Sequence, residues 1–276
     1  MKAVVILSGG QDSTYCLAWA ALQFGRAEVA AITFNYGQRH AREIQAAKDV
    51  AMLLGITNHE VINLGDGILK GTSPLTDKSA ELEQYSDYET MDKIIGSRIE
   101  KTFVPMRNAL FLTIGANRAA VLGATHLVTG VCEQDNANYP DCREKFILQQ
   151  EMTINEALGF SLTDDRGIII ATPLIHKSKA QAIKDMISDG TYPLLAFTHT
   201  AYDGQYPPLG NDHATVLRAQ GFLEAGVPDP LMVRASMEGL LPDGLPQTPN
   251  YAPEAFPVGL LDQIREMNRI VMGVAA

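Results

Sequence analysis

Six residues near the start of the chain are the ones best suited to chemistry: Ser8, Gly9, Gly10, Gln11, Asp12 and Ser13. An apolar run at 3–7 precedes them, and a helix-like segment at 14–24 follows. A strand, a glycine turn and a helix in this order direct backbone N–H groups and the positive end of a helix toward phosphate. The glycines allow the close backbone approach that this requires. Asp12 would repel phosphate unless a divalent cation lay between them, so the loop predicts a site for a Mg²⁺–nucleotide complex.

This loop matches neither of two familiar phosphate-binding motifs. The chain has no Gly-x-x-x-x-Gly-Lys-Ser/Thr sequence, and the turn holds no lysine for the β- and γ-phosphates. The Gly-x-Gly-x-x-Gly fingerprint of dinucleotide-binding proteins is also missing. The pattern Ser-Gly-Gly-x-Asp-Ser resembles the pyrophosphate loop of the N-type ATP pyrophosphatases, which adenylate a carboxylate or carbonyl oxygen and release pyrophosphate. An ordinary glycine-rich turn is the other interpretation, and the strand–turn–helix context argues against it.

Four further stretches make the resemblance more specific. They are residues 34–40 (Phe-Asn-Tyr-Gly-Gln-Arg-His) followed by Glu43, residues 102–108 (Thr-Phe-Val-Pro-Met-Arg-Asn), residues 129–143, and residues 172–179 with Lys177 and Lys179. Taken together, they closely resemble the 7-cyano-7-deazaguanine synthases, the nitrile-forming enzymes of the queuosine pathway. The resemblance covers roughly residues 1–226.

The resemblance implies a ligase that uses ATP and Mg²⁺. In that family, 7-carboxy-7-deazaguanine is adenylated at its carboxylate, ammonia gives the amide, and a second activation dehydrates the amide to the nitrile. It also implies a homodimer with small-molecule partners only. Three other activities stay open: an enzyme that stops at 7-amido-7-deazaguanine or passes the activated deazaguanine to another acceptor, a sulfur-transfer enzyme with Cys132 and Cys142 as a relay pair, and a nucleotide-binding module without catalysis.

The resemblance assigns the catalytic roles to five residues: Asp12, Arg107, Arg143, Lys177 and Cys132. ATP and the substrate carboxylate repel each other, and the guanidinium groups of Arg107 and Arg143 can offset that repulsion through bidentate pairing. Lys177 would neutralise pyrophosphate as it leaves. Cys132 would act as a nucleophile, or would simply be packed in the pocket.

Substrate binding is expected from nine residues: Tyr36, Gln38, Arg39, His40, Asn108, Gly130, Asp135, Tyr139 and Asp141. Asp141 can accept hydrogen bonds from a guanine-type N1–H and N2–H₂, and Tyr36 or Tyr139 can stack on the base. Asp135 could instead help to hold a metal. A simpler interpretation of Asn108 is that it caps the helix that follows it.

Apolar runs alternate with helical patterns along the chain. Strands are expected at 3–7, 27–34, 59–64, 126–130 and 168–171, and helices at 14–24, 41–54, 108–122, 146–158 and 178–188. This alternation predicts an α/β fold with a parallel, Rossmann-like sheet and helices on both faces. The resemblance narrows it to the adenine nucleotide alpha hydrolase type. The loops that follow the strands should meet at one edge of the sheet.

Two regions depart from this alternation. Residues 65–101 form a long polar segment, and residues 227–258 contain seven prolines. An apolar helical stripe then follows at 260–271. We therefore expect a synthase domain at 1–226 and, at 227–276, a smaller region made of a proline-rich connector and a docking helix that packs on its own subunit or on a second copy.

Composition narrows the partners and the compartment. The net charge of −10 and a pI near 5.0 argue against direct, non-specific binding to nucleic acid. Three cysteines and a start that runs straight into a strand predict a reduced, cytoplasmic protein without a targeting segment. No apolar run is long enough to predict a membrane span.

One feature of the family is missing from this chain. Family members usually carry four cysteines that bind a structural zinc. One precedes a tyrosine, and the other three follow as Cys-x-x-Cys-x-x-Cys before a Leu-Arg-Ala-x-Gly-Phe segment. That motif is present at 217–222, but the cysteine positions hold Ala201, Leu209, Asp212 and Thr215. We expect no structural zinc, and we expect residues 206–209 and the C-terminal tail to fill its place.

Overall fold

The computed structural model describes residues 1–39, 42–71, 73–77, 79–133, 138–160 and 166–273. Its centre is an all-parallel sheet of five strands in the order β3-β2-β1-β4-β5. The strands are β1 (Ala3–Ile6), β2 (Val29–Asn35), β3 (Asn58–Asn63), β4 (His126–Val128) and β5 (Ile169–Ala171). The expected Rossmann-like sheet is confirmed, and its strand order reverses between β1 and β4, where ligands bind in folds of this kind.

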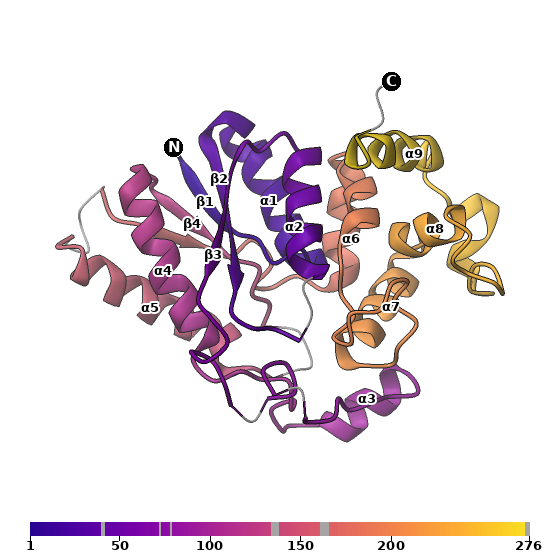
Figure 1. Cartoon of the computed structure of the whole chain (residues 1–276), viewed down its shortest axis with the longest axis horizontal. Helices are drawn as coiled ribbons and strands as arrows, with labels where there is room; N and C mark the ends of the chain where they lie inside the picture. Colours follow the sequence, from indigo (N-terminus) through magenta and orange to yellow (C-terminus); the bar gives the residue numbers. More distant parts are fainter. Residues whose placement is uncertain (40–41, 72, 78, 134–137, 161–165, 274–276) are drawn as a thin grey trace.

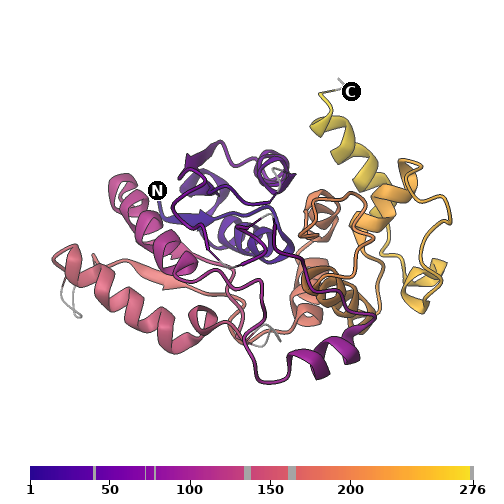
Figure 2. The same cartoon turned by 60° about the horizontal axis from the view of Figure 1, so that its bottom comes forward.

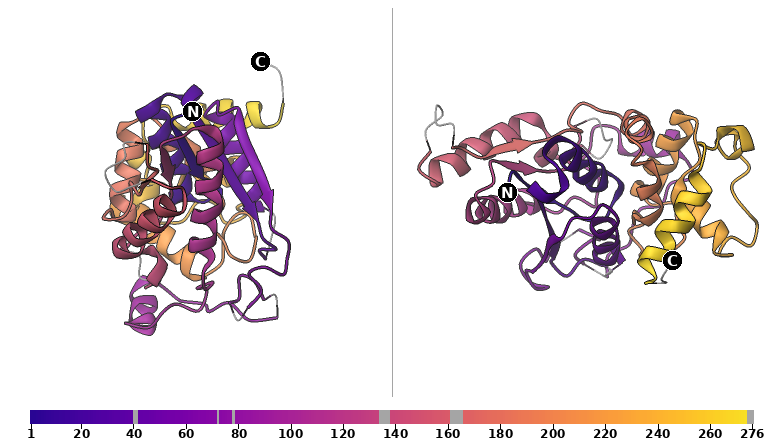
Figure 3. Two further views of the ribbon diagram at one scale, coloured as in Figure 1. Left: turned by 90° about the vertical axis from the view of Figure 1, so that its left-hand side faces the viewer. Right: turned by 90° about the horizontal axis from the view of Figure 1, so that it is seen from above.

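Helices cover both faces of this sheet (Figure 1; Figure 3, left). Val5 on β1 belongs to a core shared with α1 and α2, whereas its neighbour Val4 belongs to a second core shared with α4 and α5. The two cores form because successive side chains of a strand point to opposite faces, so an apolar strand is buried on both sides. These helices are α1 (Gln11–Phe24), α2 (Arg42–Leu53), α4 (Arg107–Leu122) and α5 (Glu144–Ala157).

The first face continues into the C-terminal part of the chain through α6 (Lys179–Ser188). The Ser178 side chain accepts a hydrogen bond from the Gln181 amide, and the Gln181 side chain accepts one from the Ser178 amide. This capping box makes Ser178 the N-cap, so α6 begins at Lys179, one residue after the start of the helix expected at 178–188. By contrast, α4 begins at Arg107 after a left-handed Met106, so Asn108 lies inside the helix and does not cap it.

Three further helices follow α6, and α8 and α9 lie at the opposite end of the molecule from α5 (Figures 1 and 2). They are α7 (His213–Ala225), α8 (Pro230–Met237) and α9 (Leu260–Val271). We expected no regular element between 227 and 258, but α8 forms there because Asp229 caps it and Pro230 takes the first helical position. The remaining elements are α3 (Tyr88–Ile95) and the 3₁₀ turns Arg26–Glu28, Pro140–Cys142, Tyr192–Phe197, Pro249–Tyr251 and Pro253–Ala255.

The helix α9 packs on its own subunit along part of its apolar stripe. Leu260 and Ile264 are buried in the core shared with α1 and α2, whereas Leu261 and Ile270 stay partly exposed. Cys16 is buried in the same core, as expected for a small apolar residue. Within the described ranges, no helix has both the length and the apolar character needed to cross a membrane.

Candidate active site

A cavity of about 420 Å³ opens at the carboxyl ends of the strands, where β1 and β4 lie side by side. Most of the residues that sequence analysis selected line this cavity, although they come from four separate stretches of the chain. The selected residues that line it are Ser8, Gly10, Gln11, Asp12, Ser13, Tyr36, Gln38, Arg39, Arg107, Asn108, Gly130, Cys132, Tyr139 and Arg143.

Gly9 and Asp141, which were also selected, lie outside the described lining of the cavity. Gly9 is behind the cavity surface, packed on α2. Asp141 is buried next to the cavity, where its backbone oxygen accepts a hydrogen bond from Asn108 at 3.4 Å. Burial raises the pKa of the Asp141 carboxyl, and nearby Arg107 opposes that rise. His40 and Asp135 fall outside the described residues.

The loop at residues 8–13, where the sequence predicts nucleotide binding, is held closed by its own serines. The two hydroxyl groups of Ser8 and Ser13 are 3.0 Å apart, and Ser13 also accepts a hydrogen bond from the Ser8 amide at 3.1 Å. Gly9 has a φ of +87°, and a Cβ there would lie 2.2 Å from the Glu43 carbonyl oxygen. Gly10 then precedes the first residue of α1. The result is a turn that presents amide groups and a helix N-terminus to the cavity.

The carboxylate of Asp12 forms an ion pair with a lysine from another part of the chain. Lys179, at the start of α6, reaches it with 2.6 Å between Nζ and Oδ2, and both side chains line the cavity. Lys177 is directed elsewhere: its amine donates to the Tyr15 hydroxyl at 2.8 Å and pairs with Asp185. The structure therefore brings Lys179 into the cavity and leaves Lys177 outside its lining.

Aromatic rings cover the side of the cavity that follows β2. Phe111 on α4 stacks on Phe34 with 4.2 Å between ring centroids and meets the edge of Tyr36 at 5.4 Å. The Gln38 side chain accepts from the Tyr36 amide at 2.9 Å. Arg39 donates to the carbonyl oxygens of Pro74 and Ala80, at 3.2 and 3.0 Å. These contacts fix the loop after β2 and join it to the long polar segment 65–101.

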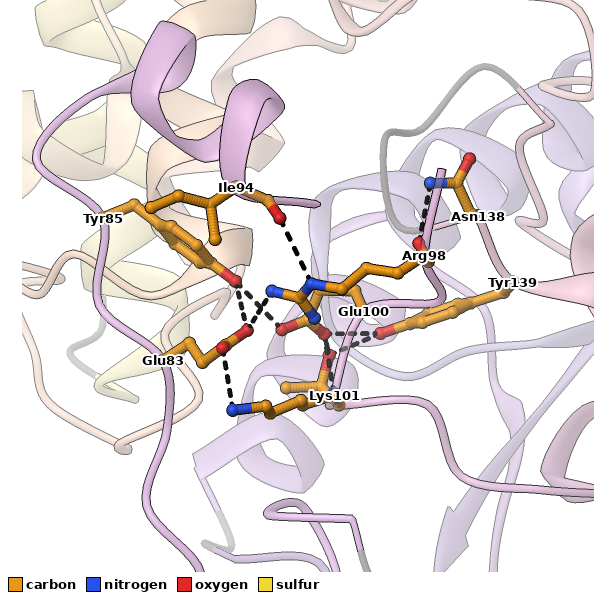
Figure 4. Close-up of polar contacts among 9 residues, drawn as sticks. Glu83, Tyr85, Ile94, Arg98, Glu100, Lys101, Asn138 and Tyr139 are labelled. Atoms are coloured by element: carbon orange, nitrogen blue, oxygen red, sulfur yellow. Dashed lines mark hydrogen bonds and ion pairs between the residues drawn. The ribbon is translucent and has the colours of Figure 1, made fainter. Parts of the chain in front are cut away.

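Tyr139 is positioned by that same segment (Figure 4). Its hydroxyl donates to the carboxylate of Glu100 at 3.3 Å, and this carboxylate also accepts from the Thr102 amide at 2.7 Å. Next to Tyr139 along the chain, the Asn138 side chain donates to the carbonyl oxygens of Gly96 and Arg98, at 3.0 and 2.9 Å. Residues 96–102 thus hold the loop that carries Tyr139 over the cavity.

A second carboxylate anchors these contacts from outside (Figure 4). Glu83 pairs with Arg98 at 2.6 Å and with Lys101 at 2.9 Å. Burial alone would raise the pKa of Glu83, but the hydrogen bonds from Lys101 and Arg98 outweigh it and lower the pKa to about 2. Nothing in the spacing of Glu83, Arg98 and Lys101 distinguishes them from other surface charges, so their role could not be predicted from the sequence.

The cavity lining also includes residues that were given no role from the sequence, among them Glu43, Lys179, His199, Tyr202 and Arg218. Glu43 and Lys179 belong to the stretches at 34–43 and 172–179 that carry the family resemblance, so the sequence did point to them. His199 comes from a segment without a motif, and its amide donates to the Gly9 carbonyl at 2.9 Å. Arg218 is buried and makes a two-pronged ion pair with Asp229, the N-cap of α8, at 2.6 and 2.7 Å.

The four positions where the family carries zinc cysteines do not fit that metal. Ala201 is fully buried and Leu209 is 59% exposed, and neither has a ligand atom in its side chain. The single carboxylate, on Asp212, accepts from the amide and the hydroxyl of Thr215 at 3.0 and 3.1 Å and from the Tyr202 amide at 3.2 Å. A tetrahedral thiolate site cannot be built from these side chains.

The expected replacement for the zinc site is partly present. Pro207 and Pro208 are buried, whereas Leu209 is exposed and does not fill the space assigned to it. The tail does cover the region: the Tyr206 hydroxyl donates to Glu238 at 2.7 Å, and Arg234 on α8 lies over the rings of Tyr206 and Phe197. Hydrogen bonds to Asp212 and packing of α8 thus connect the segments that cysteines connect in the family.

The fold and the cavity define a Rossmann-like α/β protein with its site at the carboxyl edge of a parallel sheet. The family model described as queuosine biosynthesis protein QueC matches residues 2–226. The 7-cyano-7-deazaguanine synthase of Gloeobacter violaceus is 45% identical over 233 residues, which cover 83% of this chain and 95% of that relative. The synthase of Chromobacterium violaceum is 42% identical over 238 residues, 86% of this chain and 95% of its own. The chain belongs to the QueC family of enzymes.

Proposed function

We propose that this chain converts 7-carboxy-7-deazaguanine and ammonia to 7-cyano-7-deazaguanine in two ATP-dependent activations. The observation that carries the proposal is the convergence of two kinds of residue on one cavity. The loop at residues 8–13, with Asp12 and Lys179, lines this cavity together with Arg107 and the aromatic residues Tyr36 and Tyr139. Relatives named for this reaction support the same conclusion.

The charges of the cavity suit an attack of a carboxylate on the α-phosphate of ATP. Two anions must approach each other, and fixed cations reduce the cost of that approach. Arg107 can pair with the substrate carboxylate, and Lys179 can move from Asp12 to the departing pyrophosphate. Asp12 would then hold Mg²⁺, which screens the phosphates when it is bound. In this assignment Lys179 takes the role that the sequence suggested for Lys177.

The flat base would lie between the tyrosines. Tyr36 and Tyr139 come from loops after β2 and β4, and each is fixed by contacts on its outer side, to Phe111 and to Glu100 respectively. A rigid aromatic surface loses little conformational entropy when it binds a ring. Asn108, Asp141 and Arg143 lie near the loop after β4, and their polar groups would form hydrogen bonds with the edge of the base.

A reaction followed by mass spectrometry tests this function. The purified chain is incubated with 7-carboxy-7-deazaguanine, ATP, Mg²⁺ and ammonium, and pyrophosphate is assayed in parallel. The nitrile together with pyrophosphate is the expected result. The amide as the only product would mean that a single activation occurs. ATP bound without consumption of the acid would contradict the proposal and favour a binding module.

A further inference from the structure

Glu43 is a cavity-lining carboxylate that the proposed function has not used. It lies in the first turn of α2, where the helix N-terminus favours negative charge. Its backbone carbonyl is packed against Gly9 of the nucleotide loop, because a Cβ on that glycine would lie 2.2 Å from the carbonyl oxygen. The backbone of Glu43 is thus fixed against the loop at residues 8–13, and the residue lines the cavity in which the acyl adenylate would form.

The surroundings of Glu43 leave its carboxylate available to take up a proton. Among the described residues, no group donates a hydrogen bond to it and no cation pairs with it within 4.0 Å. Burial raises its pKa to about 7, with Arg107 opposing that rise. Among the described residues, Tyr36 and Tyr202 also interact with it, and burial raises the pKa values of both, so that they stay neutral near neutral pH.

The other acidic residues that line the cavity are already engaged. Asp12 is paired with Lys179 at 2.6 Å. Glu133 accepts a hydrogen bond from the Glu144 amide, in the first turn of α5, at 3.3 Å. The thiol of Cys132 donates to the Lys177 carbonyl at 3.2 Å. Within the described part of the lining, Glu43 is thus the carboxylate that is best placed to take up a proton.

We propose that Glu43 is the catalytic base that removes a proton from ammonium as nitrogen attacks the activated carboxyl carbon. This inference rests on the proposed function. Ammonium gives one proton to the Glu43 carboxylate, and the nitrogen lone pair forms the new carbon–nitrogen bond. The bond from that carbon to the phosphate oxygen breaks, and AMP leaves with the electron pair. The added nitrogen loses a second proton to solvent, which gives the neutral amide.

Hydroxylamine separates this role from all others, because it is unprotonated near neutral pH and needs no base before it attacks. Wild-type protein and the variant Glu43→Gln are compared with ammonium and with hydroxylamine, and the amide, the hydroxamate and pyrophosphate are measured. We expect Glu43→Gln to form the hydroxamate and pyrophosphate within about twofold of wild type and to lose about 100-fold in amide formation from ammonium. Raising the pH should restore amide formation, because free ammonia then becomes abundant.

The outcomes of this comparison are distinct. Equal ammonium dependence in both proteins would overturn the inference, and so would an equal loss of amide and hydroxamate, which would indicate a structural role. If wild type yields neither hydroxamate nor pyrophosphate, the proposed function itself fails. The matched control is Asp49→Asn on the same helix, whose carboxylate pairs with Gln45 on the outside of the protein. If Glu43→Gln does not fold, Glu43→Asp gives the same comparison with the carboxylate moved back from the adenylate.

Discussion

The Asp212 carboxylate accepts a hydrogen bond from the backbone amide of Tyr202, with 3.2 Å between the two atoms. Asp212 is 2% exposed and also caps α7, whereas the side chain of Tyr202 lines the cavity. One buried carboxylate therefore joins the start of α7 to a residue that lines the cavity. The cysteine positions that the family resemblance implies, at 201, 209, 212 and 215, lie in these same two segments.

Replacing this carboxylate should destabilise the protein. Asp212→Ala removes the acceptor for two backbone amides and one hydroxyl, and we expect a loss of about 1–3 kcal/mol in the free energy of unfolding. Urea denaturation measures it. Asp203→Ala is the matched control, because Asp203 is exposed and caps only a local turn. Equal midpoints for the two variants would show that packing of α8 alone replaces the zinc.

The two lysines near α6 should differ in their effect on catalysis. Lys179→Gln removes the cation beside Asp12, and we expect pyrophosphate release to fall about 100-fold. Lys177→Gln, which breaks contacts to Asp185 and Tyr15 outside the cavity lining, should change it by less than about threefold. Pyrophosphate release under saturating ATP measures both. The reverse order would return the role to Lys177.

Asp12→Asn should lower pyrophosphate release far more than it lowers thermal stability. The substitution keeps the size of the side chain and removes the charge that would hold Mg²⁺. Part of the carboxylate is open to the cavity, with 29% of the side chain exposed, so few packing contacts are lost. Thermal melts and pyrophosphate assays on the same preparation give the comparison. Proportional losses in both would make Asp12 mainly structural.

Replacing Glu100 should weaken binding of the deazaguanine and leave binding of ATP unchanged. Glu100→Gln weakens the hydrogen bonds that fix Tyr139 through its hydroxyl and the neighbouring Thr102. We expect KM for the deazaguanine to rise several-fold and KM for ATP to stay constant. Steady-state kinetics with each substrate varied measures the split. Glu89→Gln, whose side chain is 85% exposed, is the control. A parallel rise in both KM values would mean that the cavity as a whole is disturbed.

Glu43 should make folding stability depend on pH in a predictable direction. Its pKa is raised from 4.5 to about 7 in the folded state, so the folded protein binds more protons than the unfolded chain between these values. Stability from this group is therefore lost as the pH rises from 4.5 to 7, by on the order of 2 kcal/mol. Glu43→Gln should remove that loss. Chemical denaturation of both proteins across this range tests it, and parallel curves would contradict it.

Much of the fold could be predicted because its strands are short apolar runs that alternate with helical patterns. Even β3, at the edge of the sheet and only half-buried, was found from its position in that alternation. The helix α3 was missed because it is short and buries only Met91 and Ile95. The helix α8 was missed because the prolines around it hide its pattern, although Pro230 itself starts the helix.

The candidate site could be predicted where its residues follow strands in sequence. The positions of Tyr36 and Gly130 in the cavity lining could be predicted because the carboxyl ends of parallel strands meet at one edge of the sheet. Glu100 could not be predicted, because its role depends on Tyr139, which is distant in sequence. Lys177 and Lys179 could not be told apart, because the choice depends on the direction in which α6 begins.

The ion pair between Arg218 and Asp229 spans the expected boundary between residues 226 and 227. Both side chains are almost fully buried, and Arg218 also lines the cavity. A chain cut after Gly226 would keep the guanidinium in the interior without its carboxylate, at a cost of about 3–5 kcal/mol. The buried ion pair crosses the boundary that the sequence pattern suggests. We expect the tail and the rest of the chain to unfold in one transition, and we expect shortening of the tail to lower activity because Arg218 lines the cavity.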